Sequence, residues 1–118
     1  MKYVHHLSIA LALLSTPALG TPALAQAPEA LNHFRTGYEL MQKRSYRNAA
    51  IELELAVSID STYGNAHYVL AQAYKVLNEY DKAIGSFIAA RALGTKPERA
   101  AKELGQLSHK AAINSFGQ

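Results

Sequence analysis

The chain has 118 residues, with 12 Lys and Arg against 9 Asp and Glu, and no cysteine. The length suits one small domain, and the lack of cysteine excludes a disulfide framework, a thiolate zinc site, a cysteine nucleophile and a c-type haem attachment site. The formal net charge of +3 is too small and too scattered to indicate nucleic acid, so no nucleic-acid partner is expected.

Residues 1–25 have the features of a secretory signal peptide. Lys2 gives a positive start, the apolar run LSIALALL follows at 7–14, and the segment ends in a small-x-small cleavage pattern at Ala25. The apolar run is far shorter than the ~20 residues that span a bilayer, and two prolines follow it, so we expect no stable membrane span after cleavage. The pattern predicts export to the periplasm or secretion.

The remaining chain is predicted to be helical after a short lead-in at 26–29. Apolar residues recur three and four positions apart, which is the helical period. The expected helices run over about 29–43, 46–59, 63–77, 80–93 and 96–112, with a C-terminal tail at 113–118. The connections are short, so successive helices are expected to pack antiparallel. Gly94 stands where a left-handed helix stop is expected, and Thr95 is the expected cap of the last helix.

A shift of 34 residues aligns two copies of one helix–turn–helix unit. Identical residues align at four places: His33 with His67, Tyr46 with Tyr80, Ala49 with Ala83 and Ala56 with Ala90. Residues of similar character align at Gly37 with Ala71 and at Leu53 with Phe87.

The second copy resembles the tetratricopeptide (TPR) repeat family, whose pattern is W-x2-L-G-x2-Y…A-x3-F…P. Its matching residues are Leu70-Ala71-x2-Tyr74, then Ala83-x3-Phe87, then Ala90. The first copy matches more weakly, and Ser61 and Thr95 stand where the family places its closing proline. The resemblance implies an all-α fold of antiparallel helix–turn–helix pairs, stacked as a short right-handed TPR solenoid over 30–112. Its parts would be repeats 30–63 and 64–97 and a capping helix at 96–112.

The resemblance also implies which residues pack the repeats together. Small residues would allow close approach of the helices, and larger ones would fill the spaces between them. The set is Gly37, Ala49, Leu53, Ala56, Ala71, Tyr74, Ala83, Phe87 and Ala90.

In TPR arrays the first helix of each unit lines a concave groove, which implies a surface for an extended or helical peptide. The candidates are Phe34, Tyr38, Met41, Tyr68, Gln72, Lys75, Arg99 and Lys102. We expect apolar anchors at the aromatic end and acidic groups of the partner at the basic end, near Lys75 and Lys102. An ordinary solvated face is the alternative for the basic residues. The carboxylate clamp of some TPR proteins is not expected, because Phe34, Tyr38 and Val69 stand where it requires Lys and Asn.

Catalytic motifs are missing from the sequence, which has no Gly-rich phosphate loop, HExxH motif or hydrolase nucleophile elbow. We therefore expect no enzyme activity, no catalytic residues and no cofactor. His33, His67 and His109 are conceivable metal ligands. Two of them share one packing position in successive repeats, so no metal site is expected.

These features together predict a protein–protein adaptor or assembly factor of a bacterial cell envelope, which binds another protein in its groove. A non-catalytic structural or metal-binding helical envelope protein is the alternative. Two repeats and one helix are fewer than the usual three repeats, so marginal stability alone and self-association are also expected.

Overall fold

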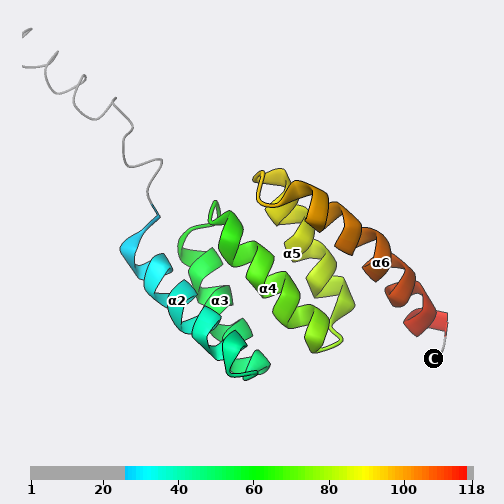
Figure 1. The fold of residues 1–118 in the computed structure, drawn as a ribbon, viewed down its shortest axis with the longest axis horizontal. Helices are drawn as coiled ribbons and strands as arrows, with labels where there is room; N and C mark the ends of the chain where they lie inside the picture. The colour runs from blue at the N-terminus through cyan, green and yellow to red at the C-terminus, as the bar shows by residue number, and fades with distance from the viewer. Residues whose placement is uncertain (1–25, 117–118) are drawn as a thin grey trace, which may run out of the picture.

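The computed structural model describes residues 26–116, and every regular element in this range is a helix. The helices are α2 (Pro28–Gln42), α3 (Tyr46–Ile59), α4 (Gly64–Val76), α5 (Tyr80–Ala92) and α6 (Pro97–Phe116). Each helix packs against the next one in the chain (Figure 1). The predicted all-α fold of stacked antiparallel helix pairs is confirmed. The predicted signal peptide, at 1–25, lies outside the described residues.

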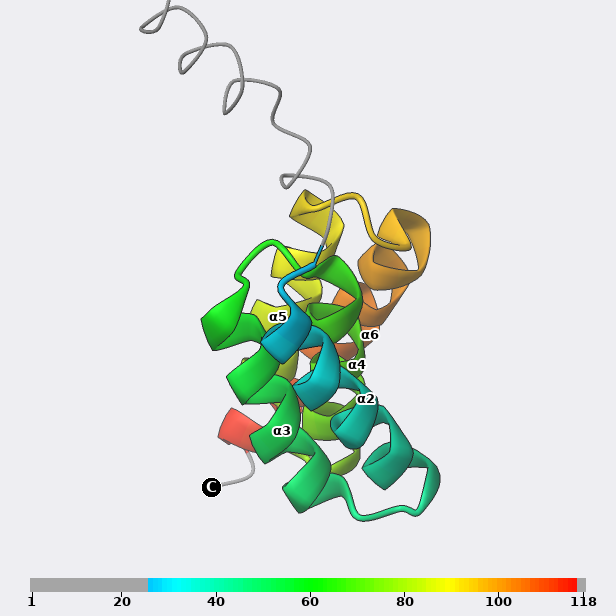
Figure 2. The ribbon, with the colours of Figure 1, turned by 90° about the vertical axis from the view of Figure 1, so that its left-hand side faces the viewer.

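The five helices form two layers. Figure 2 shows α2, α4 and α6 toward one side and α3 and α5 toward the other. The helices α2 and α4 also contact each other directly. The first helix of each pair therefore contributes to one face, which is the arrangement that the groove prediction requires. Within 26–116, no helix is long and apolar enough to cross a membrane.

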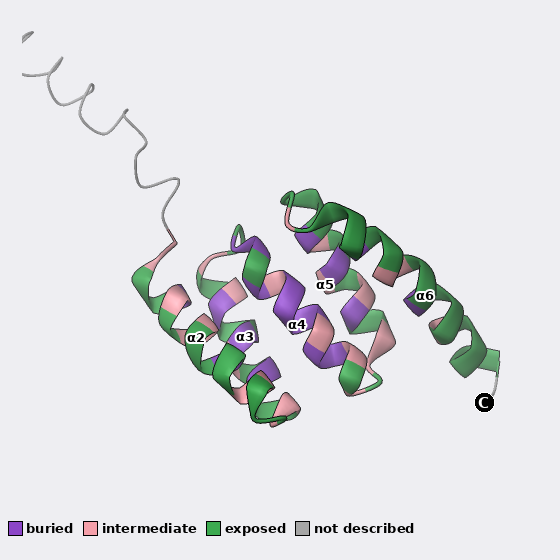
Figure 3. Ribbon diagram, in the orientation of Figure 1, coloured by how far each residue is buried: buried purple, intermediate pink, exposed green. Residues whose placement is uncertain are grey.

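The interior is built from residues spaced one repeat apart. Every packing residue named from the sequence is buried in the structure, and Leu53, Phe87 and the alanines on α3 and α5 among them have no exposed surface. Figure 3 shows that α4, at the centre of the array, is the most continuously buried helix and that α6 is mostly exposed. The core thus lies between the two layers, and α6 covers its last open side through Ala100 and Leu107.

Gly37 shows how closely the paired helices approach. A Cβ atom at this position would lie 2.7 Å from Cγ of Leu53 and 3.3 Å from the carbonyl oxygen of Ala49. Real Cβ atoms do not come so near another carbon, because dispersion attraction turns into repulsion well before that distance. The side chain of Leu53 therefore occupies space on α2 that only glycine leaves free.

Three helices end in the same left-handed turn. The residues with positive φ are Arg44 (61°), Asn78 (60°) and Gly94 (76°), which follow α2, α4 and α5. At the last of these, the N–H of Gly94 donates to the carbonyl of Arg91 and the N–H of Thr95 donates to the carbonyl of Ala90. The same pair of bonds closes the other two turns, and this pattern is the Schellman motif. The left-handed stop predicted at Gly94 is confirmed.

The last helix differs from the sequence prediction at both ends. Its first backbone hydrogen bond runs from the N–H of Ala100 to the carbonyl of Lys96, so Lys96 is the N-cap and the prediction of Thr95 is wrong. The helix continues to Phe116 instead of ending at 112, so 113–116 are not a tail. No proline or glycine falls at 112–116 to end the helix earlier. The lead-in is also shorter than predicted, because α2 begins at Pro28, where proline suits the first turn.

Ala90→Glu is expected to abolish the cooperative unfolding transition. Ala90 has no exposed surface, and an uncompensated buried charge costs on the order of 3–5 kcal/mol, a large share of the stability of a small domain. Thermal unfolding followed by circular dichroism measures the effect. Ala92→Glu, on the exposed side of the same helix, is the control and should change stability by about 1 kcal/mol or less. A wild-type melting curve for Ala90→Glu would contradict the close packing.

Arg44→Gly is expected to raise the free energy of unfolding by about 1 kcal/mol, since a left-handed residue with a side chain costs ~1–2 kcal/mol and the flexibility of unfolded glycine offsets part of the gain. Urea denaturation measures the change. Gly94→Ala is the matched reverse substitution and should lower stability. A Cβ there meets no atom within 4 Å, so the loss reports backbone strain alone. Destabilisation by Arg44→Gly would show that the arginine side chain outweighs the strain.

Candidate functional site

A pocket opens where α2, α4 and the start of α6 meet. Its volume is about 360 Å³, near the lower end of the ~300–1,000 Å³ usual for ligand pockets. The lining residues are Phe34 and Tyr38 from α2, Asn65, Tyr68 and Val69 from α4, and Lys96 just before α6. All of them come from the layer formed by the first helices, so the pocket lies on the face predicted to be a groove.

One wall of the pocket is aromatic. The ring centroid of Phe34 lies 4.9 Å from that of Tyr63 and 6.0 Å from that of Tyr38. Tyr63 is buried at the start of α4, and its burial raises the pKa of its hydroxyl, which favours the neutral phenol. Tyr38 is 47% exposed. The aromatic wall is therefore anchored in the interior by Tyr63, and the ring of Tyr38 remains accessible at the surface.

The floor of the pocket is continuous with the core. Tyr68 and Val69 are both buried, and the ring of Tyr68 packs edge-on against Phe87 at a centroid distance of 5.5 Å. Phe87 has no exposed surface. The sequence analysis expected Tyr68 to be an apolar anchor for a partner. The structure places most of its ring beneath the surface, where it supports the floor.

Lys96 closes the end of the pocket nearest α6. Its Nζ lies 4.8 Å from the centroid of the Tyr68 ring, which is cation–π geometry. Sequence reasoning missed this residue: the predicted last helix began at 96, but the groove candidates on that helix began at Arg99. In the structure the helix begins at Pro97, and Lys96 lies just before it. The one available signal was its place directly before Pro97, at the start of a first helix. A lysine there can extend back over the preceding helix.

The predicted basic end of the groove is altered by an ion pair. Nζ of Lys75 lies 2.8 Å from Oε2 of Glu103, which joins α4 to α6. The charge of Lys75 is thus balanced within the chain, while Arg99 and Lys102 remain exposed on α6. The structure therefore brings Phe34, Tyr38 and Tyr68 together in one pocket. The candidates that do not line it are Met41, Gln72, Lys75, Arg99 and Lys102.

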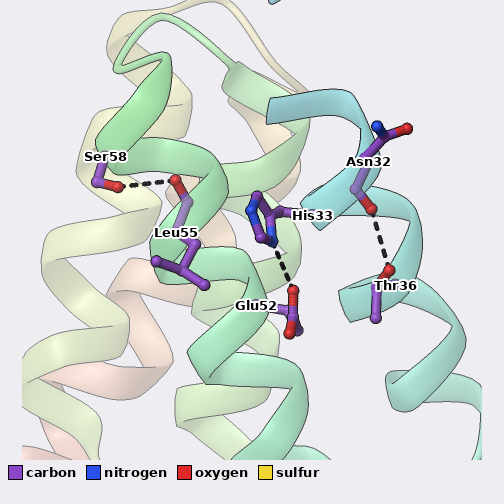
Figure 4. A network of polar contacts seen from close by, with 6 residues as sticks. All are labelled: Asn32, His33, Thr36, Glu52, Leu55 and Ser58. Carbon is purple, nitrogen blue, oxygen red and sulfur yellow. Dashed lines mark hydrogen bonds and ion pairs between the residues drawn. The ribbon is translucent and has the colours of Figure 1, made fainter. Parts of the chain in front are cut away.

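The two repeated histidines have different partners. Nδ1 of His33 lies 2.7 Å from Oε2 of Glu52, across the contact between α2 and α3 (Figure 4). His67 donates from Nε2 to the carbonyl of Ser61, at 2.9 Å. Within 26–116, no three side chains of His, Cys, Asp or Glu are grouped to hold a metal ion. Each of these two histidines ties its helix to a neighbouring segment.

Tyr74 links α4 to α3. Its hydroxyl donates a hydrogen bond to the carboxylate of Glu54. Burial, and then this hydrogen bond and the negative charge of Glu54, raise the pKa of Tyr74 well above its ordinary value. Nζ of Lys82 lies 5.5 Å from the centroid of the same ring. The hydroxyl of Tyr74, which is one of the packing residues, therefore has a hydrogen-bond partner at the edge of the core.

Comparison with known proteins bears on the fold. No family model and no curated protein sequence matches the chain. Among solved structures, the chain is similar to one titled "Crystal structure of MamA", with a TM-score of 0.64 and 22% sequence identity. The fold is TPR-like. The match covers 80% of this chain and 54% of that one, so this chain spans about half the length of the matched structure. At this identity the likeness concerns the fold alone.

Tyr74→Phe is expected to reduce the loss of stability at alkaline pH. The pKa of Tyr74 is raised in the folded chain above its ordinary value of 10.0, so the unfolded state loses this proton first. The free energy of unfolding should then fall as the pH rises above about 10. Urea denaturation at several pH values measures how steeply the free energy of unfolding falls with pH. Glu54→Gln should keep the part of this pH dependence that comes from burial of Tyr74. Equal slopes for the wild type and Tyr74→Phe would contradict the raised pKa.

Proposed function

We propose that this protein is a non-catalytic interaction module that binds a peptide or helix of another protein in the groove between α2, α4 and the start of α6. The observation that carries the proposal is the pocket of about 360 Å³, whose lining comes from these elements. A TPR-like fold supports it, because helical repeat arrays bind partners on the concave surface made by their stacked units.

The construction of the pocket favours a partner with a protruding apolar side chain. Its wall presents Phe34 and the exposed ring of Tyr38, and its floor rests on the buried Phe87. Aromatic side chains offer a large contact area with few rotatable bonds, so little entropy is lost when a ligand immobilises them. A preformed surface limits the entropic cost of binding further. The lining holds no carboxylate or histidine for acid–base chemistry, which favours binding over catalysis.

We further propose that the module works outside the cytoplasm, as an adaptor or assembly factor of a bacterial cell envelope. The support is the sequence of residues 1–25, with its positive start, short apolar run and small-x-small end. Edman sequencing of the protein recovered from its own cells tests this part. A mature N-terminus at or near Gln26 is expected, and an intact Met1 on all of the protein would contradict it.

Tyr38→Ala is expected to weaken peptide binding roughly tenfold, because truncation of a central aromatic contact typically costs 1–2 kcal/mol. The probe is a peptide selected on the full chain from a displayed random library, and fluorescence anisotropy measures its affinity. Ile51→Ala is the matched control. Ile51 is 52% exposed on α3, in the other layer, against 47% for Tyr38.

Nuclear magnetic resonance locates the bound peptide independently of the variants. The amide signals expected to shift are those of α2, α4 and the residues just before α6. Shifts confined to α3 and α5, or an equal loss of affinity in Tyr38→Ala and Ile51→Ala, would exclude binding in the groove.

A further inference from the structure

We infer that the bound segment carries an Asp or Glu side chain next to its apolar anchor, and that Lys96 binds this carboxylate at the edge of the pocket. The inference rests on the proposed function, since it specifies the ligand of the same pocket. It differs from the sequence prediction, which placed the contact with acidic groups at Lys75 and Lys102.

The charge of the pocket supports an anionic ligand. Lys96 is the single charged residue among the six that line it. Across the described residues, the ammonium of Lys96 forms no ion pair with a carboxylate. The charged residues nearest in sequence are Glu98 and Arg99, which oppose each other. Behind the aromatic wall, the charges of Arg35 and Asp60 act on Tyr63 in opposite directions. The charge at the pocket is therefore the positive charge of Lys96.

Two lysines of the same layer are held in different ways. Nζ of Lys75 lies 2.8 Å from a carboxylate oxygen of Glu103, so its charge is neutralised within the chain. Nζ of Lys96 is instead placed 4.8 Å from the centroid of the Tyr68 ring. A cation–π contact restrains an ammonium group and leaves N–H donors free on the side away from the ring, since lysine has three. Lys96 is thus oriented and still able to donate to a carboxylate.

The backbone at Lys96 gives a second, independent reason to assign it a role. Its φ is +44°, in the left-handed region, where a side chain is unfavourable. Pro97 follows, and a residue before proline prefers extended backbone. Glycine would fit this conformation better, as it does at Gly94 nearby. Strained residues are concentrated at binding sites, and the feature that lysine adds over glycine here is its ammonium group.

The neighbouring surface defines the rest of the ligand. Phe34, Tyr38 and Val69 form an apolar surface beside Lys96, and the pocket they line holds one or two side chains of moderate size. A segment with Leu, Ile or Phe next to Asp or Glu would place its apolar side chain against this surface. Its carboxylate would then lie within reach of Nζ.

Matched peptides test the inference on the full chain. The display-selected peptide is synthesised with an amidated C-terminus, so that its only carboxylates are side chains, in one version with Glu beside the apolar anchor and in another with Gln. The wild type is expected to bind the Glu version about tenfold more tightly, the size of one charged hydrogen bond. This preference should shrink as the salt concentration rises.

Substitutions of Lys96 isolate its part in the preference. Lys96→Gln should bind both peptides equally, and Lys96→Arg should restore the preference for Glu. Lys43→Gln, at an exposed lysine that follows α2 and lies outside the pocket, removes the same charge and should behave as the wild type. Lys96→Gly should raise the thermal midpoint while it removes the preference, whereas a merely structural lysine would alter the midpoint alone.

The outcomes separate this inference from the proposed function. If peptides bind in a Tyr38-dependent manner but Lys96→Gln keeps the preference for Glu, or the wild type shows none, the role of Lys96 is overturned and the groove remains. If a free C-terminal carboxylate is required in place of Glu, the inference is also overturned. If no selected peptide depends on Tyr38, both proposals are overturned.

Discussion

Close approach of paired helices through residues with little or no side chain is the constraint on which this structure depends. Cγ of Leu53 lies only 2.7 Å from the position that a Cβ on Gly37 would take. The alanines at the repeated positions, Ala49 and Ala56 on α3 and Ala83 and Ala90 on α5, have no exposed surface at all. Because the helices meet at these points, each unit has a fixed separation and the next unit stacks in one register. The first helices are thereby aligned on one face, where the pocket between α2, α4 and the start of α6 opens.

The same packing supports the candidate site. Phe87 lies between two fully buried alanines, Ala83 and Ala90, and its ring supports Tyr68 from below. Tyr68 in turn holds the ammonium of Lys96 over its face. An unbroken series of contacts therefore runs from the core of the second unit to the edge of the pocket. A change at the helix contact would be transmitted to the pocket, because packed interiors are nearly incompressible.

Polar contacts between helices lie at the edges of the apolar core and have a different role from the close packing. The pair of His33 and Glu52 joins α2 to α3, Tyr74 and Glu54 join α4 to α3, and Lys75 and Glu103 join α4 to α6. Partly exposed pairs of this kind contribute little free energy each, at most about 1 kcal/mol. They fix orientation between helices whose association comes from apolar burial. One consequence is electrostatic: Glu103 balances the charge of Lys75, whereas Lys96 leaves a positive charge at the pocket.

The sequence by itself determined the helices, their pairing and the packing residues. The 3.6-residue period of apolar residues is a local signal that can be read directly from the sequence. The 34-residue spacing between Ala49 and Ala83, and between Leu53 and Phe87, is a repeat signal that can be read in the same way. It also indicated the aromatic part of the pocket through Phe34 and Tyr38. Only the tertiary structure decided that Tyr68 lies beneath the surface, that Lys75 is neutralised by Glu103, and that Lys96 completes the pocket. Long side chains take their partners from helices that stacking brings near. The contact of Lys96 with Tyr68 likewise depends on where stacking places the start of α6 relative to α4, so neither kind of contact is encoded in spacing along the chain.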